Sequence, residues 1–282
     1  MINVIFLILK ILIAVYVGLC LFIYFRQSSY VYYPVRQIET VPSAAGIPFE
    51  MVRLITEDRI KITGWFIPAK TAEHGADAST CYTVIYCHGN GGNIGDYLDT
   101  AICLRDMDYN VMLFDYRGYG ESEGKPTEKG TYLDAMSVWK YLVEERKFSK
   151  DRIIIYGWSL GGSIAAWLAM NTEPYVLVLE STFVSARVMA QRMFPYLPVG
   201  LLCRYNYNTI EYVKHVKCPV LVAHSRQDET IPFEDGLTLF KEVKTRKRFV
   251  ELTGGHNDAG LIGTLEGRKA FDEFIRRDSV IR

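Results

Sequence analysis

Ser159 stands between two glycines in the stretch Gly157-Trp158-Ser159-Leu160-Gly161, which is a G-x-S-x-G pattern. An apolar run, RIIIY, precedes the pattern and a helix-forming run, LGGSIAAWLAMN, follows it, so the serine is expected on a sharp turn from strand to helix. Such a turn exposes the hydroxyl beside a helix N-terminus, where developing negative charge is stabilised. The pattern therefore predicts a nucleophile for acyl transfer. The alternative is a glycine-rich turn whose serine only caps the helix.

A serine nucleophile needs a base, and histidine has an ordinary pKa that suits this role at neutral pH. His256 lies in a glycine-rich loop, TGGHND, between the last predicted strand and a final helix expected over Gly263–Arg277. It also comes third in the chain order serine, aspartate, histidine. We therefore predict His256 as the base. Of the other histidines, we expect His74 and His215 in solvent and His224 in packing beside the site.

A third group should orient the imidazole and stabilise its charged form. Asp228 follows the apolar run CPVLVAH and has the right place in the chain order, so we predict it as the acid. Glu229 beside it and Glu180 at the end of YVLVLE are the rivals. Asp235 is expected to cap a helix start instead.

These side chains must be positioned by elements far apart in the chain. Near-continuous apolar runs alternate with segments of helical length, which indicates strands buried on both faces of a mostly parallel sheet covered by helices. Two earlier runs, FEMVRLIT and IKITGWFIP, are typical of a hairpin that leads into this sheet. In such a sheet the chemistry belongs in the loops after the carboxyl ends of the strands. The later strand candidates are YTVIYC, VMLF, RIIIY, YVLVLE, CPVLVAH and KRFVEL.

Five motifs carry a resemblance to a known family. In chain order they are HGNGGN (88–93), DYRGYGES (115–122), GWSLGG (157–162), SRQDETIP (225–232) and GGHND (254–258). With them the chain, from Ile60 to its C-terminus, resembles the α/β-hydrolase superfamily. More narrowly, it resembles single-anchor serine hydrolases related to the membrane-associated acyl-protein thioesterases. The resemblance implies an α/β-hydrolase fold.

An oxyanion needs two backbone N–H donors. One should be Leu160, the residue after the nucleophile, and the resemblance points to Asn90 in HGNGGN for the other. It also implies a structural role for His88, and we interpret Asp115 and Arg117 as bracing the neighbouring loop. HGNGGN could instead cradle a phosphate, but it matches neither G-x-G-x-x-G nor a P-loop. A metal is not expected, because no metal-ligand spacing occurs. The predicted reaction implies no cofactor either.

The first 26 residues form a separate unit. Residues 1–25 contain one charged side chain, Lys10, and Ile2–Phe25 would be about 36 Å long as a helix, enough to cross a bilayer. We predict a single membrane anchor over residues 1–26. A cleaved signal peptide is the alternative, but no A-x-A-like site follows. Basic groups on both flanks leave the membrane side of the catalytic domain undetermined. An aromatic belt is expected from Tyr24, Phe25, Tyr30, Tyr32 and Tyr33.

The remaining chain divides into an interfacial segment and linker, residues 27–48, and a catalytic domain, residues 49–282. Thr182–Thr209 is rich in Met, Phe, Leu and Tyr and contains two prolines, which favours a lid suited to an acyl chain. A helix pair packing on the sheet is the alternative. The family usually has a proline after the serine at this strand end, whereas this chain has Glu180-Ser181-Thr182, so the resemblance does not fix the backbone there.

The composition limits the partners. Thirty-two basic and thirty-two acidic residues give a net charge of zero, so nucleic acid is not expected as a partner. The six cysteines contain no CxxC pair and are expected as small buried hydrophobes. We therefore predict a membrane-anchored serine hydrolase acting on a carboxylic ester or thioester of a lipid or an acylated protein. A peptidase or amidase with the same catalytic residues, and a non-catalytic membrane module, stay open as alternatives.

Overall fold

The computed structural model describes residues 2–75, 77–258 and 260–276. Its centre is an eight-stranded sheet in the order β10-β9-β8-β7-β4-β6-β3-β2, in which β2–β3 and β3–β6 are antiparallel and the other pairs parallel. This confirms the predicted mostly parallel sheet and its antiparallel lead-in hairpin. The strands are β1 Tyr33–Pro34, β2 Glu50–Ile55, β3 Lys61–Ile67, β4 Thr83–Cys87, β5 Gly91–Gly92, β6 Asn110–Phe114, β7 Ile153–Trp158, β8 Val176–Glu180, β9 Val220–Ser225 and β10 Lys247–Leu252.

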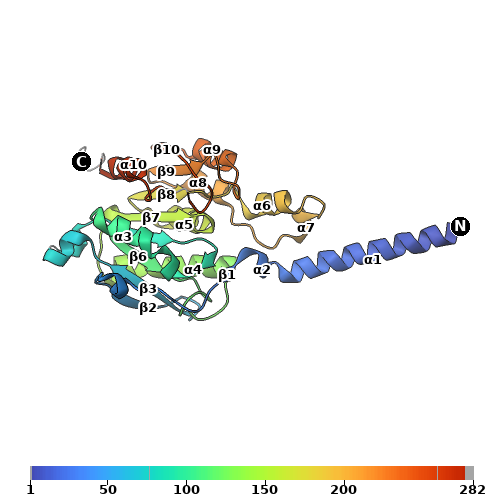
Figure 1. The fold of residues 1–282 in the computed structure, drawn as a ribbon, viewed down its shortest axis with the longest axis horizontal. Coiled ribbons are helices and arrows are strands. Elements are labelled where there is room, and N and C mark those ends of the chain that lie inside the picture. The colour runs from blue at the N-terminus through green and yellow to red at the C-terminus, as the bar shows by residue number, and fades with distance from the viewer. Residues whose placement is uncertain (1, 76, 259, 277–282) are drawn as a thin grey trace.

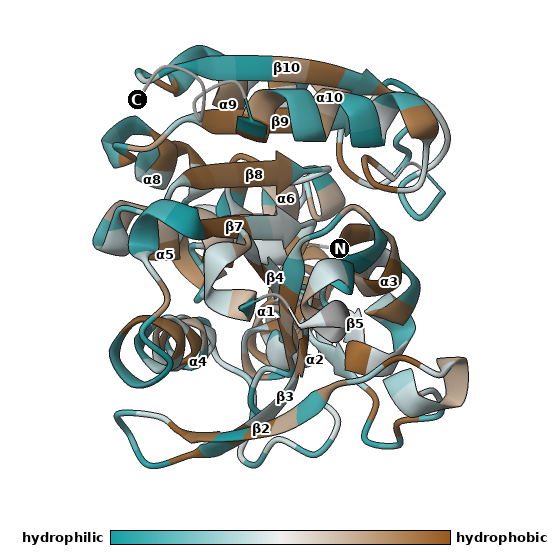
Figure 2. Ribbon diagram, turned by 90° about the vertical axis from the view of Figure 1, so that its left-hand side faces the viewer, coloured by the Kyte–Doolittle hydropathy of each residue, from teal (hydrophilic) through white to brown (hydrophobic). Residues whose placement is uncertain are grey.

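Helices cover both faces of the sheet, with α4, α5 and α8 on one face and α3 and α10 on the other (Figure 2). Strands between two helix layers lose solvent contact on both sides, so they read as continuous apolar runs. Every residue of β4, β6 and β8 is buried. The helices are α1 Ile2–Arg26, α2 Ser28–Val31, α3 Leu98–Asp106, α4 Glu128–Lys140, α5 Leu160–Thr172, α6 Ala186–Met193, α7 Val199–Leu202, α8 Thr209–His215, α9 Phe233–Glu242 and α10 Leu265–Arg276.

The N-terminal helix α1 projects away from the domain as a single rod (Figure 1). Its length and apolar composition make it a candidate membrane span, and nearly all of its surface is exposed. Helices α6 and α7 lie on the side of the domain from which α1 leaves (Figure 1). The final helix, predicted over Gly263–Arg277, begins at Leu265 and is described as far as Arg276, and Arg277 lies outside the described residues.

The segment after the anchor is not a free linker. Strand β1 pairs with β5, and the side chain of Asn93 donates to the carbonyls of Val35 (3.2 Å) and Gln37 (2.7 Å). Tyr32 is buried and its hydroxyl lies 2.7 Å from that of Tyr207. The assignment of Tyr32 to an aromatic belt is therefore wrong, because its ring packs inside the domain. The segment that follows α1 is thus fastened to the domain that contains the sheet.

Candidate active site

Ser159 occupies the turn between β7 and α5, with φ 55° and ψ −120°. A non-glycine residue with positive φ stores strain, and such strain is often found at functional sites. The turn is held from both sides, because the Ser159 N–H donates to the Glu180 carbonyl (3.0 Å) and the Thr182 hydroxyl donates to the Ser159 carbonyl (2.7 Å). These bonds fix the hydroxyl of Ser159 at the carboxyl end of β7.

The flanking glycines are required by close backbone approach. A Cβ on Gly157 would lie 2.3 Å from the carbonyl oxygen of Gly161, and a Cβ on Gly161 would lie 2.0 Å from the carbonyl oxygen of Cys87. Both distances are far inside van der Waals contact with atoms that cannot rotate away. The small residues of the motif therefore let β4, β7 and the start of α5 meet at one point.

The structure brings the predicted base and acid to this serine. His256 Nε2 lies 3.0 Å from Ser159 Oγ, and His256 Nδ1 lies 2.8 Å from Asp228 Oδ2. The imidazole also stacks on the ring of Trp158, with the centroids 5.2 Å apart. The three side chains come from the ends of β7, β9 and β10, and they form one hydrogen-bonded chain.

Asp228 is held in its charged form. Burial alone would raise the pKa of its carboxyl, but hydrogen bonds from His224, His256 and the Ile231 N–H outweigh burial and bring the pKa below its ordinary value. Its Oδ1 accepts the N–H groups of Thr230 (2.9 Å) and Ile231 (2.7 Å). An ionised, immobile carboxylate at this position can orient an imidazole and stabilise its protonated form.

The rivals for the acid bind elsewhere. Glu180 accepts from the Tyr156 hydroxyl and from the Leu261 N–H (2.8 Å), and burial raises its pKa to about 7. Glu229 accepts the backbone N–H of His256 (3.0 Å) and not its ring. The sequence suggested that Asp235 caps the start of α9, and this prediction is wrong. The Asp235 carboxylate instead accepts from the Arg192 guanidinium (2.6 and 2.9 Å) and from the Val184 N–H. The reason is that the apolar segment after β8 brings a cation to this carboxylate.

The remaining histidines take supporting positions. His224 packs beside the site, as expected, with Nε2 2.9 Å from the Ile231 carbonyl and 3.4 Å from Asp228. His88 is buried, its Nδ1 lies 2.8 Å from the Gly89 carbonyl, and burial lowers its pKa to about 4. His215 is exposed, and the side chain of His74 lies outside the described part of the chain.

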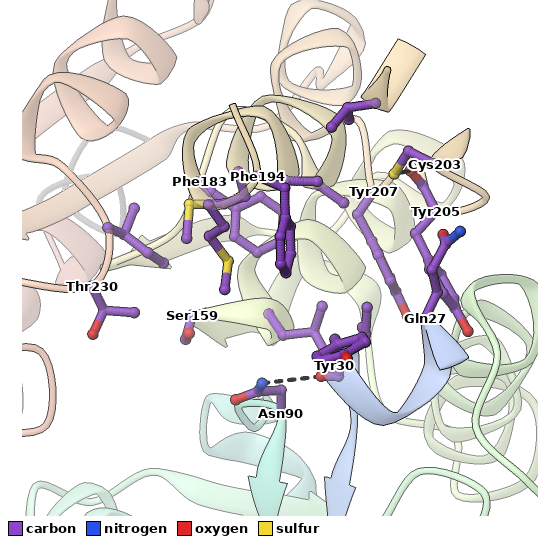
Figure 3. Close-up of a pocket in the computed structure, with 18 of the residues that line it drawn as sticks. Gln27, Tyr30, Asn90, Ser159, Phe183, Phe194, Cys203, Tyr205, Tyr207 and Thr230 are labelled. Atoms are coloured by element: carbon purple, nitrogen blue, oxygen red, sulfur yellow. Dashed lines mark hydrogen bonds between the residues drawn. The ribbon is translucent and has the colours of Figure 1, made fainter. Parts of the chain in front are cut away.

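The two predicted oxyanion donors line the same cavity as Ser159. Leu160 is the first residue of α5, so its N–H has no acceptor within the helix. Asn90 follows β4, its carbonyl accepts from the Tyr33 N–H (2.9 Å), and its side chain donates to the Val31 carbonyl (3.0 Å; Figure 3). Leu160 and Asn90 therefore stay predictions for the oxyanion hole.

Asp115 and Arg117 lie behind the site, as structural side chains. Asp115 Oδ1 accepts the Ile94 N–H (2.9 Å). Arg117 binds Asp134 (2.9 Å) and Asp58. These contacts brace the loop after β6 against α4 and the β2–β3 turn.

A cavity of about 410 Å³ opens beside Ser159 and is lined mainly by apolar side chains (Figure 3). The predicted lid region supplies one wall from α6 and the chain that follows it. Just before this region Ser181 adopts φ 46°, so the strand end that departs from the family pattern has a strained backbone. The lining side chains from the region include Phe183, Met189, Met193, Phe194 and Leu197.

Sequence reasoning missed a second wall of this cavity. Ile23, Gln27 and Tyr30 line it, although they belong to the end of α1 and to the segment that follows it, where the sequence predicted an anchor and a linker. The only signal in the sequence was the density of aromatic residues after the anchor, which is equally typical of a membrane interface. Trp158, which stacks on the histidine, was also not singled out.

Sheet order, the serine on the β7–α5 turn and a histidine after the last strand together define the α/β-hydrolase class. A family model described as "alpha/beta hydrolase fold" matches residues 82–182. The chain is 30% identical to "Alpha/beta hydrolase domain-containing protein WAV2" of Arabidopsis thaliana over 271 residues, covering 87% of this chain and 86% of that protein. The chain belongs to the α/β-hydrolase family.

Two further likenesses are to a yeast protein and to a solved esterase structure. "Uncharacterized membrane protein YNL320W" of Saccharomyces cerevisiae is 35% identical over 225 residues, which cover 77% of this chain and 76% of the yeast protein. The solved structure of the Pyrococcus furiosus esterase Pf2001 superposes with a TM-score of 0.69 at 24% identity, covering 87% of this chain and 98% of the esterase. The second likeness establishes the fold.

Proposed function

We propose that this protein is a membrane-anchored serine hydrolase that cleaves a carboxylic ester or thioester of a lipid or an acylated protein. The observation that carries the proposal is the hydrogen-bonded chain from Ser159 Oγ through His256 to Asp228 at the edge of an apolar cavity. Protein side chains and water supply every group that this chemistry needs.

In the first half of the reaction, His256 Nε2 takes the proton of Ser159 as Oγ attacks the substrate carbonyl carbon. The carbonyl oxygen becomes an oxyanion, for which the N–H groups of Leu160 and Asn90 are the proposed donors. When the tetrahedral intermediate collapses, His256 gives the proton to the leaving alcohol or thiol. An acyl-enzyme remains, with the acyl group bonded to Ser159 Oγ.

In the second half, His256 takes a proton from water, and the resulting hydroxide attacks the acyl carbon. Collapse of this second intermediate returns the proton to Ser159 Oγ and releases the carboxylic acid. Asp228 supports both halves, because its carboxylate fixes the tautomer of His256 and stabilises the imidazolium. The strained turn at Ser159 keeps the nucleophile in place throughout.

The substrate class is inferred from the surroundings of the site. Apolar side chains from the lid region and the anchor line the cavity, which suits an acyl chain better than a polar group. The candidate span α1 is attached directly to this domain, and the yeast relative is named a membrane protein. Both observations favour a substrate held in or at a membrane.

The test is labelling with a fluorophosphonate probe, which forms an adduct with an activated serine. We expect the full-length protein to be labelled and Ser159→Ala to lose the label. Ser163→Ala is the matched control, because Ser163 lies one turn further along α5 with its side chain buried. An adduct that persists in Ser159→Ala would remove the nucleophile from the proposal. Rates on matched ester, thioester and peptide substrates then separate an esterase from a peptidase.

A further inference from the structure

The cavity at Ser159 is built partly from the membrane anchor. Ile23 and Gln27 belong to the last turns of α1 or follow it directly, and both line the cavity that Ser159 and His256 also line. Its volume of about 410 Å³ falls within the range of small-ligand pockets. The site therefore begins where the candidate membrane span ends.

The lid region is fastened to this end of the anchor. The side chain of Gln27 donates to the Leu202 carbonyl (2.7 Å) and accepts the Arg204 N–H (2.8 Å). Further along α1, the Tyr16 hydroxyl donates to the Tyr196 carbonyl (2.9 Å). The chain around α7 thus contacts α1 and the residue after it at two points, Tyr16 and Gln27, and lies near the domain end of α1 (Figure 1).

These contacts set the depth of the lid. A 25-residue helix is about 37 Å long, roughly 7 Å more than the hydrocarbon core of a bilayer. Tyr16 lies ten residues before Arg26, which is about 15 Å along the helix. Even if the whole excess length lies on the Arg26 side, Tyr16 and its partner Tyr196 are about 8 Å inside the hydrocarbon. If α1 spans the membrane, the part of the lid region around Tyr196, residues 193–203, lies within one leaflet. We call these residues the tip of the lid.

The sequence of the tip fits this location. Residues 193–203 carry no charged side chain and are bounded by Arg192 and Arg204. Tyr196 and Leu201 are 89% and 82% exposed, which is costly in water and favourable in lipid. Backbone donors in hydrocarbon must be paired within the protein. Five N–H groups of the tip donate to carbonyls of the same segment, those of Leu197, Val199, Leu201, Leu202 and Cys203.

We propose that the tip of the lid, residues 193–203, is inserted into one leaflet, and that the cavity receives the acyl chain of a membrane ester from that leaflet. The acyl chain of the substrate enters between α1 and the lid region and reaches Ser159 without crossing water. The inference rests on the proposed function, because it takes Ser159 as the nucleophile and α1 as a membrane anchor. The substrate it selects is a long-chain ester lipid.

The experiment compares two esters with the full chain in phosphatidylcholine vesicles. One is a palmitoyl ester of 4-methylumbelliferone dissolved in the bilayer, and the other is its water-soluble butyryl ester. We expect Leu201→Glu to lower the ratio of kcat/KM for the palmitoyl over the butyryl ester at least tenfold. Leu265→Glu is the matched control, because Leu265 is 71% exposed at the start of α10, far from α7 (Figure 1). This control should keep the wild-type ratio.

The outcomes separate the inference from the function beneath it. If the wild type hydrolyses neither ester, the proposed function fails and the inference with it. If both esters are hydrolysed but Leu201→Glu and Leu265→Glu give the same ratio, the inference is overturned and the proposed function stands.

A second measurement does not depend on catalysis. The emission of a Leu201→Trp variant should be quenched by brominated phosphatidylcholine more strongly than that of Leu265→Trp, with wild type as the background for the four native tryptophans. Equal quenching of the two variants would place the tip outside the bilayer and overturn the inference.

Discussion

Replacing Asp228 by asparagine changes one atom and should reverse the tautomer of the base. The Asp228 Oδ1 atom accepts two backbone N–H groups, and Oδ2 accepts from His256 Nδ1. An asparagine oxygen at the Oδ1 position keeps both backbone bonds, so its NH₂ group must face His256. If the amide were turned around, its NH₂ group would face the N–H groups of Thr230 and Ile231, and no acceptor would remain for these two donors. The orientation of the new side chain is therefore determined by its neighbours.

The catalytic consequence follows from that orientation. The NH₂ group of Asp228→Asn donates to His256 Nδ1, which leaves the ring proton on Nε2. That nitrogen lies 3.0 Å from Ser159 Oγ and would then donate to the hydroxyl, so it could not take its proton. A triad with the wrong tautomer loses about 10⁴-fold in kcat, or about 5.4 kcal/mol of barrier at 1.36 kcal/mol per factor of ten.

The assay is kcat on a soluble short-chain ester, with thermal unfolding to verify that the variant is folded. Glu229→Gln is the matched control, because the Glu229 carboxylate accepts the backbone N–H of His256 and a glutamine oxygen can do the same. We expect this control to lose less than tenfold. If Asp228→Asn keeps more than a tenth of the wild-type kcat, or if Glu180→Gln reproduces the full loss, the assignment of the acid is wrong.

Three further predictions concern the framework of the site. In denaturant titrations the free energy of unfolding of Ser159→Gly should exceed that of Ser159→Ala by about 1 kcal/mol. Glycine relieves the strain of the positive φ, and this gain is larger than the cost of its greater entropy in the unfolded chain. Equal free energies of unfolding would show that the turn is unstrained. Gly161→Ala should lower the free energy of unfolding by more than about 2 kcal/mol, since the added Cβ would clash with the Cys87 carbonyl. Gly200→Ala should lower it little in the same titration, because a Cβ there has no neighbouring atom within 4 Å. Burial raises the pKa of Asp115 to about 8, above its unfolded value. Its neutral form therefore stabilises the fold at low pH, and this contribution is lost, at about 1.4 kcal/mol per pH unit, as the pH rises from 4 to 8. The free energy of unfolding of Asp115→Asn, measured at pH 5, 7 and 9, should not show this loss. If variant and wild type lose the same free energy of unfolding between these pH values, the prediction is wrong.

Sequence alone predicted the strand–turn–helix at Ser159 because its determinants are local. Burial on both faces makes β7 a continuous apolar run, and glycines are required where the backbones of β4 and α5 meet. Chain order then selected His256 and Asp228 from many candidates, and the structure places both within hydrogen-bonding distance of their partners. Local pattern and chain order were sufficient to predict that these three side chains lie together.

Contacts between distant segments could not be predicted in this way. Tyr32 bonds to a residue 175 positions away, and nothing in its neighbourhood distinguishes a buried tyrosine from one at a membrane interface. Asp235 stands at a helix start, which is typical of a cap, but Arg192 reaches it from another segment. In both cases the partner, and not the local sequence, decides the role.

The segment that follows α1 is bonded to the loop that carries Asn90. Tyr33 donates to the Asn90 carbonyl, and the Asn90 side chain donates to the Val31 carbonyl, so the segment that leaves α1 fixes the loop that holds a proposed oxyanion donor. A shift of α1 against the domain would move Asn90 as well as the wall formed by Gln27. Oxyanion stabilisation depends on donors set in advance, so under the proposed function the position of α1 would contribute to the geometry of the site. The pairing of β1 with β5 directly after α1 holds this segment against the domain.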